Sequence, residues 1–295
     1  MKNTEFQYAT AFVSSTFSDM VSERNLVMYR VLPKVKKWAF DHGIIFDVVD
    51  LRWGISDEQS QDLHHTIKIC LQKVQESDPI FLCFLGQRYG WVPTEVDFHQ
   101  GMFATDISPF KNLSATELEI IQAIDAAFFA SAPKSALFMF RQPLDFSNVP
   151  QAVTEQYADM ASQEKLELLK TNIAKRYPVI SYDAKFYAKQ NEYVLEDFMA
   201  EGVPLEDVMC AKIIALLKEK YGIDETTPLI SNDQETLQRF HLKRLSLLPP
   251  IRRCCDVMQD CLDRTQEYCT GFIGIHPHSA AYSQVAHFIL EQKAK

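Results

Sequence analysis

Glycine is scarce in this chain of 295 residues. Nine glycines are present, where average usage would give about 20. A collagen-like or glycine-rich disordered chain is therefore excluded, and the position of each glycine is informative. Three of them, Gly54, Gly86 and Gly90, lie at or a few residues beyond the ends of two segments in which β-strands are expected.

Long apolar runs and blocks of basic residues are also missing. No segment reaches the ~18 apolar residues that a membrane helix needs, and the N-terminus has no apolar signal-peptide core. The 30 basic and 39 acidic side chains give a formal charge of −9, without the cationic cluster that binds nucleic-acid phosphates. The sequence therefore predicts a cytoplasmic protein with neither nucleic-acid nor membrane partners.

The seven cysteines follow no metal-binding spacing. An odd number in a reducing compartment predicts small buried side chains rather than disulfides. Cys254, Cys255 and Cys261 share one predicted helical stripe with apolar residues, and with Cys269 they lack the C-x-x-C pairs of zinc sites. No metal site is expected.

The first two thirds of the chain alternate short apolar runs with segments of 3.6-residue periodicity, which is typical of β-α-β units. Strands are predicted at residues 9–14, 44–51, 80–86, 136–141 and 179–182. Helices are predicted at 18–42 with a kink at Pro33, and at 62–76, 114–130, 151–174 and 205–221. This order predicts an α/β fold, flavodoxin-like or TIR-like, with a five-stranded parallel sheet and helices on both faces.

The composition becomes polar after Gly222, which indicates a domain boundary. We predict an α/β domain over residues 6–222, a helical linker over 223–268 and the start of a second α/β domain over 269–295. The last region contains one predicted strand and one helix, which cannot bury a core by themselves. The second domain is therefore predicted to be truncated.

Polar side chains gather where the predicted strands end, the edge at which open parallel sheets bind ligands. Strand one ends in Ser14, Ser15 and Thr16, directly before a helix N-terminus that can hold a phosphate. Simple helix capping by Ser15 or Thr16 is the alternative interpretation.

The next two predicted strands add charged and aromatic candidates. Strand two ends in Asp50, Arg52 and Trp53, which either hold an anionic or ribose-like ligand or include an Asp50–Arg52 ion pair. Strand three leads into Arg88 and Tyr89, between glycines that permit close backbone approach. The long segment 94–113 that follows is a candidate lid.

The helix predicted from Ser114 carries the candidate catalytic residue, Glu119. Ser114 and Glu117 have the spacing of a capping box, whereas Glu119 has small neighbours, including Thr116, that leave room for a ribose. A carboxylate there can stabilise or attack the oxocarbenium-like centre of glycosidic cleavage. A solvated acid near the positive end of the helix dipole is the alternative.

Four ordered motifs carry a family resemblance: FVSSTFSDMVSERN, VDLRWGISDEQS, ICLQKVQESDPIFLCFLGQRYGWVP and SATELEIIQA. They resemble the TIR-like N-terminal domain of NACHT-type (STAND) NTPases, which include the NACHT and WD-repeat proteins and the telomerase-associated vault protein. The resemblance is close over residues 9–127 and looser to 221. It implies a flavodoxin-like fold and a signalling or scaffold role. Residues 116–123 also resemble the T-x-x-E-I-x-x-A pattern of nucleoside deoxyribosyltransferases, which implies a catalytic role for Glu119.

In such NTPases a linker leads into a P-loop, and here the equivalent residues are 276–283. His276 and Ala281 stand where the P-loop has glycines, and Tyr282 stands where it has lysine. A phosphate cradle needs both features. The segment is therefore predicted to be a degenerate P-loop whose NTPase function is lost.

Two functions from different classes remain open. The first is a signalling and interaction module that binds protein partners, including itself, with residual nucleotide binding. The second is an enzyme that cleaves the N-glycosidic bond of NAD or a nucleoside, with Glu119 as its carboxylate. NAD is the candidate substrate, and no cofactor is assigned. The ligand-binding candidates are Ser14, Ser15, Thr16, Asp50, Arg52, Trp53, Arg88, Tyr89 and Thr116.

Overall fold

The computed structural model describes residues 6–50, 80–92, 112–124, 135–189, 192–224 and 234–247. The predicted helix at 62–76, nearly all of the candidate lid and the predicted degenerate P-loop lie outside the described residues. The chain divides into two compact units: Gln7–Leu229 forms one, and Met1–Phe6 with Ile230–Lys295 forms the other.

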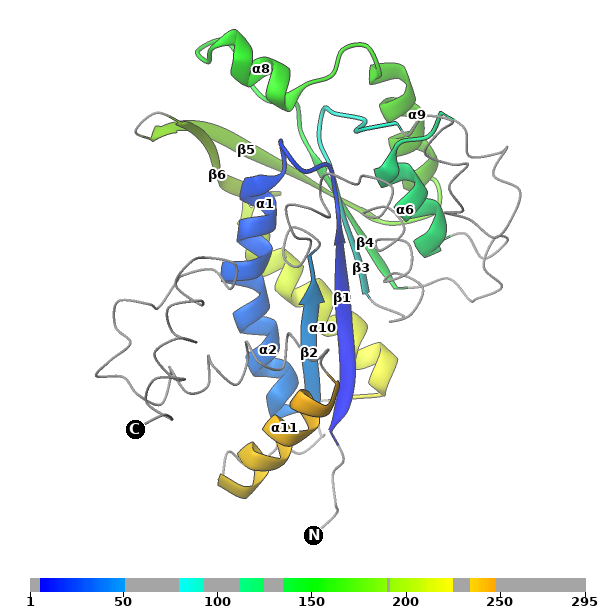
Figure 1. Ribbon diagram of the computed structural model, residues 1–295, viewed down its shortest axis with the longest axis vertical. Helices are drawn as coiled ribbons and strands as arrows, with labels where there is room; N and C mark the ends of the chain where they lie inside the picture. Colours follow the sequence, from blue (N-terminus) through cyan, green and yellow to red (C-terminus); the bar gives the residue numbers. More distant parts are fainter. Residues whose placement is uncertain are drawn as a thin grey trace, which may run out of the picture. The chain divides into compact units, whose positions relative to one another are not determined.

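A seven-stranded sheet in the order β2-β1-β3-β4-β5-β6-β7 forms the centre of the larger unit (Figure 1). The strands are β1 (Gln7–Ser14), β2 (Ile44–Val49), β3 (Ile80–Leu85), β4 (Ala136–Arg141), β5 (Val179–Lys189), β6 (Glu192–Ala200) and β7 (Val203–Pro204). Neighbouring strands among the first five pair in parallel. The β5–β6 and β6–β7 pairs are antiparallel. The parallel order 2-1-3-4-5 places the switch point of flavodoxin-like sheets between β1 and β3.

Alternate side chains of the central strands enter two apolar cores, one on each face of the sheet. On β3, Leu82 and Phe84 face the first core, whereas Phe81 and Cys83 face the second. The first core is covered by α1 (Val21–Leu26), η1 (Val27–Val31), α2 (Leu32–Asp41) and α10 (Leu205–Tyr221); the second is covered by α6 (Ala115–Ile124) and α9 (Gln163–Ala174). Helices on both faces are thus confirmed.

The predicted kink at Pro33 takes the form of a widened helical turn. Pro33 lies in the first turn of α2, directly after η1, and has no N–H with which to continue a regular helical hydrogen-bond ladder. The π-helical turn η1 precedes it, and the Leu32 N–H donates to the Val27 carbonyl. Helical structure is therefore continuous from Val21 to Asp41.

Two elements differ from the sequence prediction. Strand five does not end at Tyr182 but continues to Lys189 and returns as β6, so that the sheet has more than the five predicted strands. The single helix predicted at 151–174 is divided into α8 (Gln151–Tyr157) and α9. The division occurs because Ala158 is extended and the Asp159 N–H donates to the Gln87 carbonyl instead of a helical one.

Helix α10 has the predicted bounds and ends at Gly222, whose φ is +62°. Helix α11 (Gln234–Leu247) belongs to the smaller unit, where the rings of Phe6 and Phe240 pack edge to face with centroids 5.2 Å apart. Among the helices that the structure describes, none combines the length and apolar character needed to cross a membrane.

Candidate functional site

Glu119 extends from the second turn of α6 to the end of β1. Its Oε2 accepts a hydrogen bond of 2.6 Å from Ser14 Oγ, and the residue is only 7% exposed. Cys83 pairs with Ser14 in the β1–β3 register, and burial together with the Glu119 carboxylate raises the pKa of the Cys83 thiol far above its usual range. Glu119 is therefore a buried carboxylate at the switch point, and not the solvated acid of the alternative interpretation.

The start of α6 is fixed by Tyr89. Ser114 Oγ accepts from the Glu117 N–H at 3.2 Å, which is one half of the predicted capping box. The other half is replaced: Tyr89 Oη accepts from the Ser114 N–H at 3.3 Å and donates to the Glu117 carboxylate. Burial and Glu117 raise the pKa of Tyr89, so Tyr89 stays a neutral donor that positions the helix carrying Glu119.

Gly90 brings the loop after β3 against the loop after β1. Its φ is +96°, and a Cβ at this position would lie 3.0 Å from Thr16 Cγ2 and 3.5 Å from Thr116 Oγ1. The glycine therefore permits close contact within the protein itself. Thr16 and Thr116 are both buried there.

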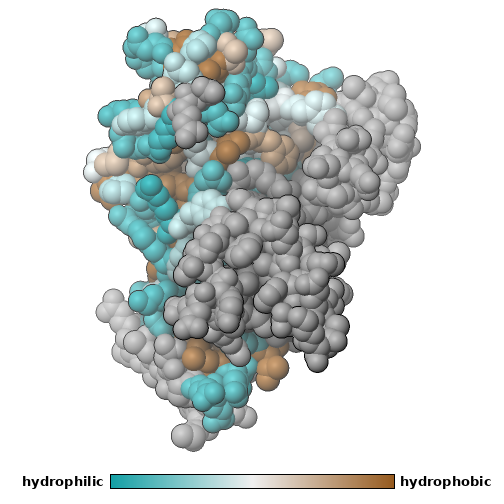
Figure 2. Space-filling view, turned by 60° about the vertical axis from the view of Figure 1, so that its left-hand side comes forward, coloured by the Kyte–Doolittle hydropathy of each residue, from teal (hydrophilic) through white to brown (hydrophobic). Residues whose placement is uncertain are grey.

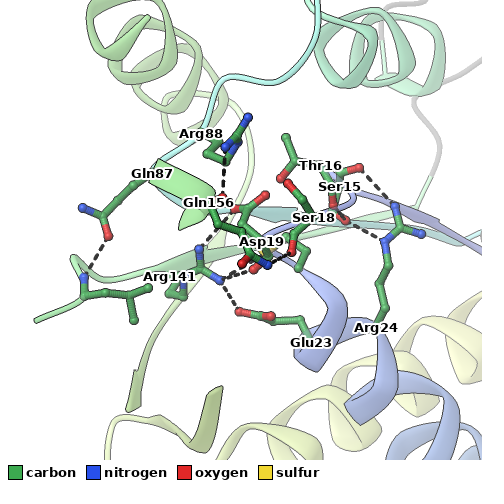
Figure 3. Close-up of polar contacts among 12 residues, drawn as sticks. Ser15, Thr16, Ser18, Asp19, Glu23, Arg24, Gln87, Arg88, Arg141 and Gln156 are labelled. Carbon is green, nitrogen blue, oxygen red and sulfur yellow. Dashed lines mark hydrogen bonds and ion pairs between the residues drawn. The ribbon is translucent and has the colours of Figure 1, made fainter. Parts of the chain in front are cut away.

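Arg24 of α1 joins the ends of β1 and β2. Its Nε donates to Ser15 Oγ at 2.8 Å, its Nη2 to the Ser15 carbonyl at 3.1 Å, and its Nη1 to Asp50 Oδ1 at 2.5 Å. Figure 3 shows the guanidinium reaching Ser15 from the helix. Asp50 thus forms an ion pair with Arg24, while Arg52 and Trp53 lie outside the described residues.

Arg141, the last residue of β4, is surrounded by acidic groups (Figure 3). Its Nη1 donates to Glu23 Oε1 at 2.6 Å and to the Asp19 carbonyl at 2.9 Å, and its Nη2 lies 3.2 Å from Asp19 Oδ2. All three side chains are completely buried. A Cβ on Gly86 would lie 2.5 Å from Arg141 Nη2, so this glycine makes room for the guanidinium.

Arg88 is directed towards α8. Its Nη1 donates to the carbonyls of Glu155 and Gln156 on α8, at 2.7 and 3.0 Å. Gln156 Nε2 in turn donates to the Ser18 carbonyl at 2.9 Å. The structure therefore joins Glu119 to Ser14, but directs Ser15 to Arg24 and Arg88 to α8. In the part of the chain described, no cluster of acidic, His or Cys side chains has a metal-binding arrangement.

Sequence reasoning missed the roles of Arg24, Glu23 and Arg141. The apolar strand ALFMFR ends in a charged residue at the edge where a site was expected. That position was a usable signal for Arg141. Its partner Glu23 lies 118 residues away, and no local pattern connects the two.

The family model of the domain of unknown function DUF4062 matches residues 10–195. The chain belongs to this family. The match includes β2 to β5, all but the first three residues of β1, and each site residue described above. The DUF4062 region therefore contains the complete switch-point edge of the sheet.

Several curated proteins are similar to parts of the chain. "Telomerase protein component 1" of Mus musculus is 37% identical over 143 residues, 48% of this chain and 5% of the relative. A TPR repeat-containing protein of Dictyostelium discoideum is 28% identical over 178 residues, 56% and 10% of the two chains. "NACHT domain- and WD repeat-containing protein 1" of Homo sapiens is 38% identical over 77 residues, 23% and 5%.

The matched region spans a tenth or less of the length of these relatives. Their names describe a telomerase component, a TPR repeat-containing protein and a protein with a NACHT domain and WD repeats. No solved structure matches the chain.

Proposed function

We propose that the DUF4062 region is a TIR-like interaction module of a NACHT-related protein, which binds protein partners, including further copies of itself. The observation that carries this proposal is the use of three arginines at the carboxyl edge of the sheet. Arg24, Arg88 and Arg141 all donate to acceptors within the protein. An edge that uses these cations to fix its own loops is suited to be a rigid scaffold, with its surface available for partners.

The described surface is compatible with partner binding. Figure 2 shows apolar residues interspersed with polar ones on one face, and exposed apolar side chains include Met160 (79%) and Leu168 (62%). The repeat-containing architectures named for the relatives also support a role in assemblies.

Sedimentation velocity of the full chain over a wide concentration range tests self-association. We expect the weight-average sedimentation coefficient to rise with concentration. Glu119→Gln is the control, since a buried carboxylate does not contribute to an outer surface and its loss leaves association unchanged. A single monomeric species at every concentration would contradict the self-association part of the proposal.

A second candidate function, cleavage of an N-glycosidic bond in NAD or a nucleoside, is favoured by the Ser14–Glu119 contact. The hydrogen bond from Ser14 fixes one carboxylate oxygen of Glu119 at the switch point, where ligands bind in such sheets. A fixed, buried carboxylate is the group that glycosidic cleavage requires.

Glu117 provides a matched control for this second function, because it lies on the same helix but faces Tyr89, and the amide oxygen of a Gln at this position can still accept the hydrogen bond from Tyr89 that fixes the start of the helix. The purified full chain is incubated with NAD and with nucleosides, beside Glu119→Gln and Glu117→Gln. We expect release of the base by the wild type and by Glu117→Gln, and its loss in Glu119→Gln. Absence of turnover in the wild type at high protein concentration excludes the enzymatic function.

A further inference from the structure

The cluster of Asp19, Glu23 and Arg141 contains more acid than its single guanidinium can neutralise. Both carboxyl groups contact Arg141, and all three side chains have no exposed surface. If both acids were ionised, the cluster would hold one excess negative charge. A buried charge without full compensation is strongly unfavourable, and a buried carboxyl usually binds a proton instead.

Within the described ranges, Arg141 is the cation that forms ion pairs with Asp19 and Glu23. Arg88, the other cation that acts on Asp19, donates to α8 carbonyls. The remaining neighbours are Tyr182 of β5, which donates to Glu23, and Tyr157 of α8, whose ring centroid lies 5.5 Å from Arg141 Cζ. Both phenols are neutral at neutral pH, because burial raises the pKa of Tyr157 to about 12 and that of Tyr182 higher still.

The hydrogen bonds to the two carboxyl groups also indicate that one acid is not fully compensated. Asp19 Oδ1 and Glu23 Oε2 are buried and have no hydrogen-bond partner among the residues that the structure describes. An ionised carboxylate with an unpaired buried oxygen loses its hydration without replacement, whereas a neutral carboxyl loses much less. Burial accordingly raises the pKa of both Asp19 and Glu23, although Arg141 acts in the opposite direction.

The hydrogen bonds distinguish the two acids. Glu23 Oε1 accepts from Arg141 Nη1 at 2.6 Å and from Tyr182 Oη at 3.2 Å. The Asp19 carboxyl has one ion-pair contact, which is longer, at 3.2 Å to Arg141 Nη2, and the Thr16 side chain and the Asp19 backbone favour its ionised form to a smaller extent than Arg141 does. Ionisation is therefore better stabilised at Glu23 than at Asp19.

We propose that this cluster is a proton-binding site, in which Asp19 keeps its proton in the folded protein at neutral pH while Glu23 and Arg141 form the ion pair. When the pH rises, Asp19 releases the proton to water and leaves a second carboxylate on one guanidinium. This weakens the contact between the loop after β1, the start of α1 and the end of β4. The site is thus a pH-sensitive lock in the fold, independent of either proposed function.

Stability against pH tests the proposal with two isosteric variants of the full chain. An acid whose pKa is raised by folding stabilises the folded state below its unfolded pKa, and that contribution is lost as the pH rises towards the folded pKa. In this window the unfolding equilibrium constant of the wild type increases by up to about tenfold per pH unit. Asp19→Asn, which mimics the protonated carboxyl, is expected to remove this increase and to be at least as stable as the wild type at pH 8.

Glu23→Gln is the control, because it removes the charge that pairs with Arg141. We expect it to destabilise the protein at neutral pH as well as at pH 8, unlike Asp19→Asn. If Asp19→Asn instead shows the same pH slope as the wild type, or is less stable at pH 8, then Asp19 is ionised in the fold and the proposal is wrong.

Carbon-13 NMR of the wild type provides a measurement that does not depend on the variants folding. The carboxyl carbon of Asp19 should titrate above the ordinary Asp value of about 3.9 and remain in its protonated position at pH 7. A carboxyl carbon of Asp19 already in its ionised position at pH 7 would overturn the assignment of the proton.

Discussion

Gly86 is the residue at which one added methyl group should be most costly. A Cβ there would lie 2.5 Å from Arg141 Nη2 and 2.7 Å from Met20 Cε, and the guanidinium cannot move away because Asp19 and Glu23 hold it. Gly86→Ala should therefore lower the free energy of unfolding by about 1–3 kcal/mol, as overpacking does. Urea unfolding in wild-type and Arg141→Leu backgrounds checks the cause: equal losses in both would exclude the guanidinium as the obstacle.

The hydrogen bonds that Arg24 makes require the planar, branched shape of a guanidinium group. It donates in three directions, to Ser15 Oγ, to the Ser15 carbonyl and to Asp50, and one ammonium group cannot span them. Arg24→Lys should cost about 1.5–3 kcal/mol, the range of hydrogen bonds to charged groups. Arg30→Lys is the matched control, since its side chain is 65% exposed beside Glu206, and surface pairs contribute little. Similar unfolding curves for the two variants would show that the network adds no stability.

The sequence predicts where the candidate residues lie in the sheet, but not which residues they contact. Strand ends mark the ligand-binding edge of an open sheet, so Ser14, Ser15, Asp50 and Glu119 could all be assigned to it from sequence. The contacts that they make join residues up to 105 positions apart. Such pairs depend on the register of neighbouring strands, which no local pattern encodes. That is why the sequence did not reveal Arg24 as a cation beside Asp50, whereas Arg52, which was proposed from its place in the chain, lies outside the described residues.

At the scale of elements, the stability of the protein should be sensitive to substitution at the residue that ends α10. Gly222 has a φ of +62°, and the following Ile223 N–H donates to the Lys218 carbonyl at 2.9 Å. A Cβ meets nothing within 4 Å, so Gly222→Ala carries only the cost of left-handed backbone, about 1–2 kcal/mol. Gly222→Asn should cost less, because asparagine tolerates this conformation. Thermal unfolding that ranks asparagine below alanine would contradict this account.

Elements were predictable where burial is uniform. Strand β4 and helix α10 have the predicted bounds, because an apolar strand buried on both faces and an apolar helical stripe ending in glycine are strong local signals. The β5–β6 ribbon was missed, since after Tyr182 most side chains of β5 are exposed and charged residues interrupt the apolar pattern. The break between α8 and α9 was missed for another reason: a contact with Gln87, distant in sequence, causes it.

At the scale of the whole molecule, the two apolar cores of the described residues lie within Gln7–Leu229. A fragment of residues 7–229 should therefore fold by itself, with one cooperative urea transition and the same pH-dependent slope as the full chain. A fragment that ends at residue 204 is the control: it lacks α10, whose Leu205, Met209, Ile213 and Leu217 are almost fully buried in the first core. Each such side chain contributes about 1.5–3 kcal/mol when it is buried. Losing four of them removes a free energy comparable to the whole of the roughly 5–15 kcal/mol that stabilises a typical domain. Cooperative unfolding of the shorter fragment, or its absence in the longer one, would show that the folding unit has different limits.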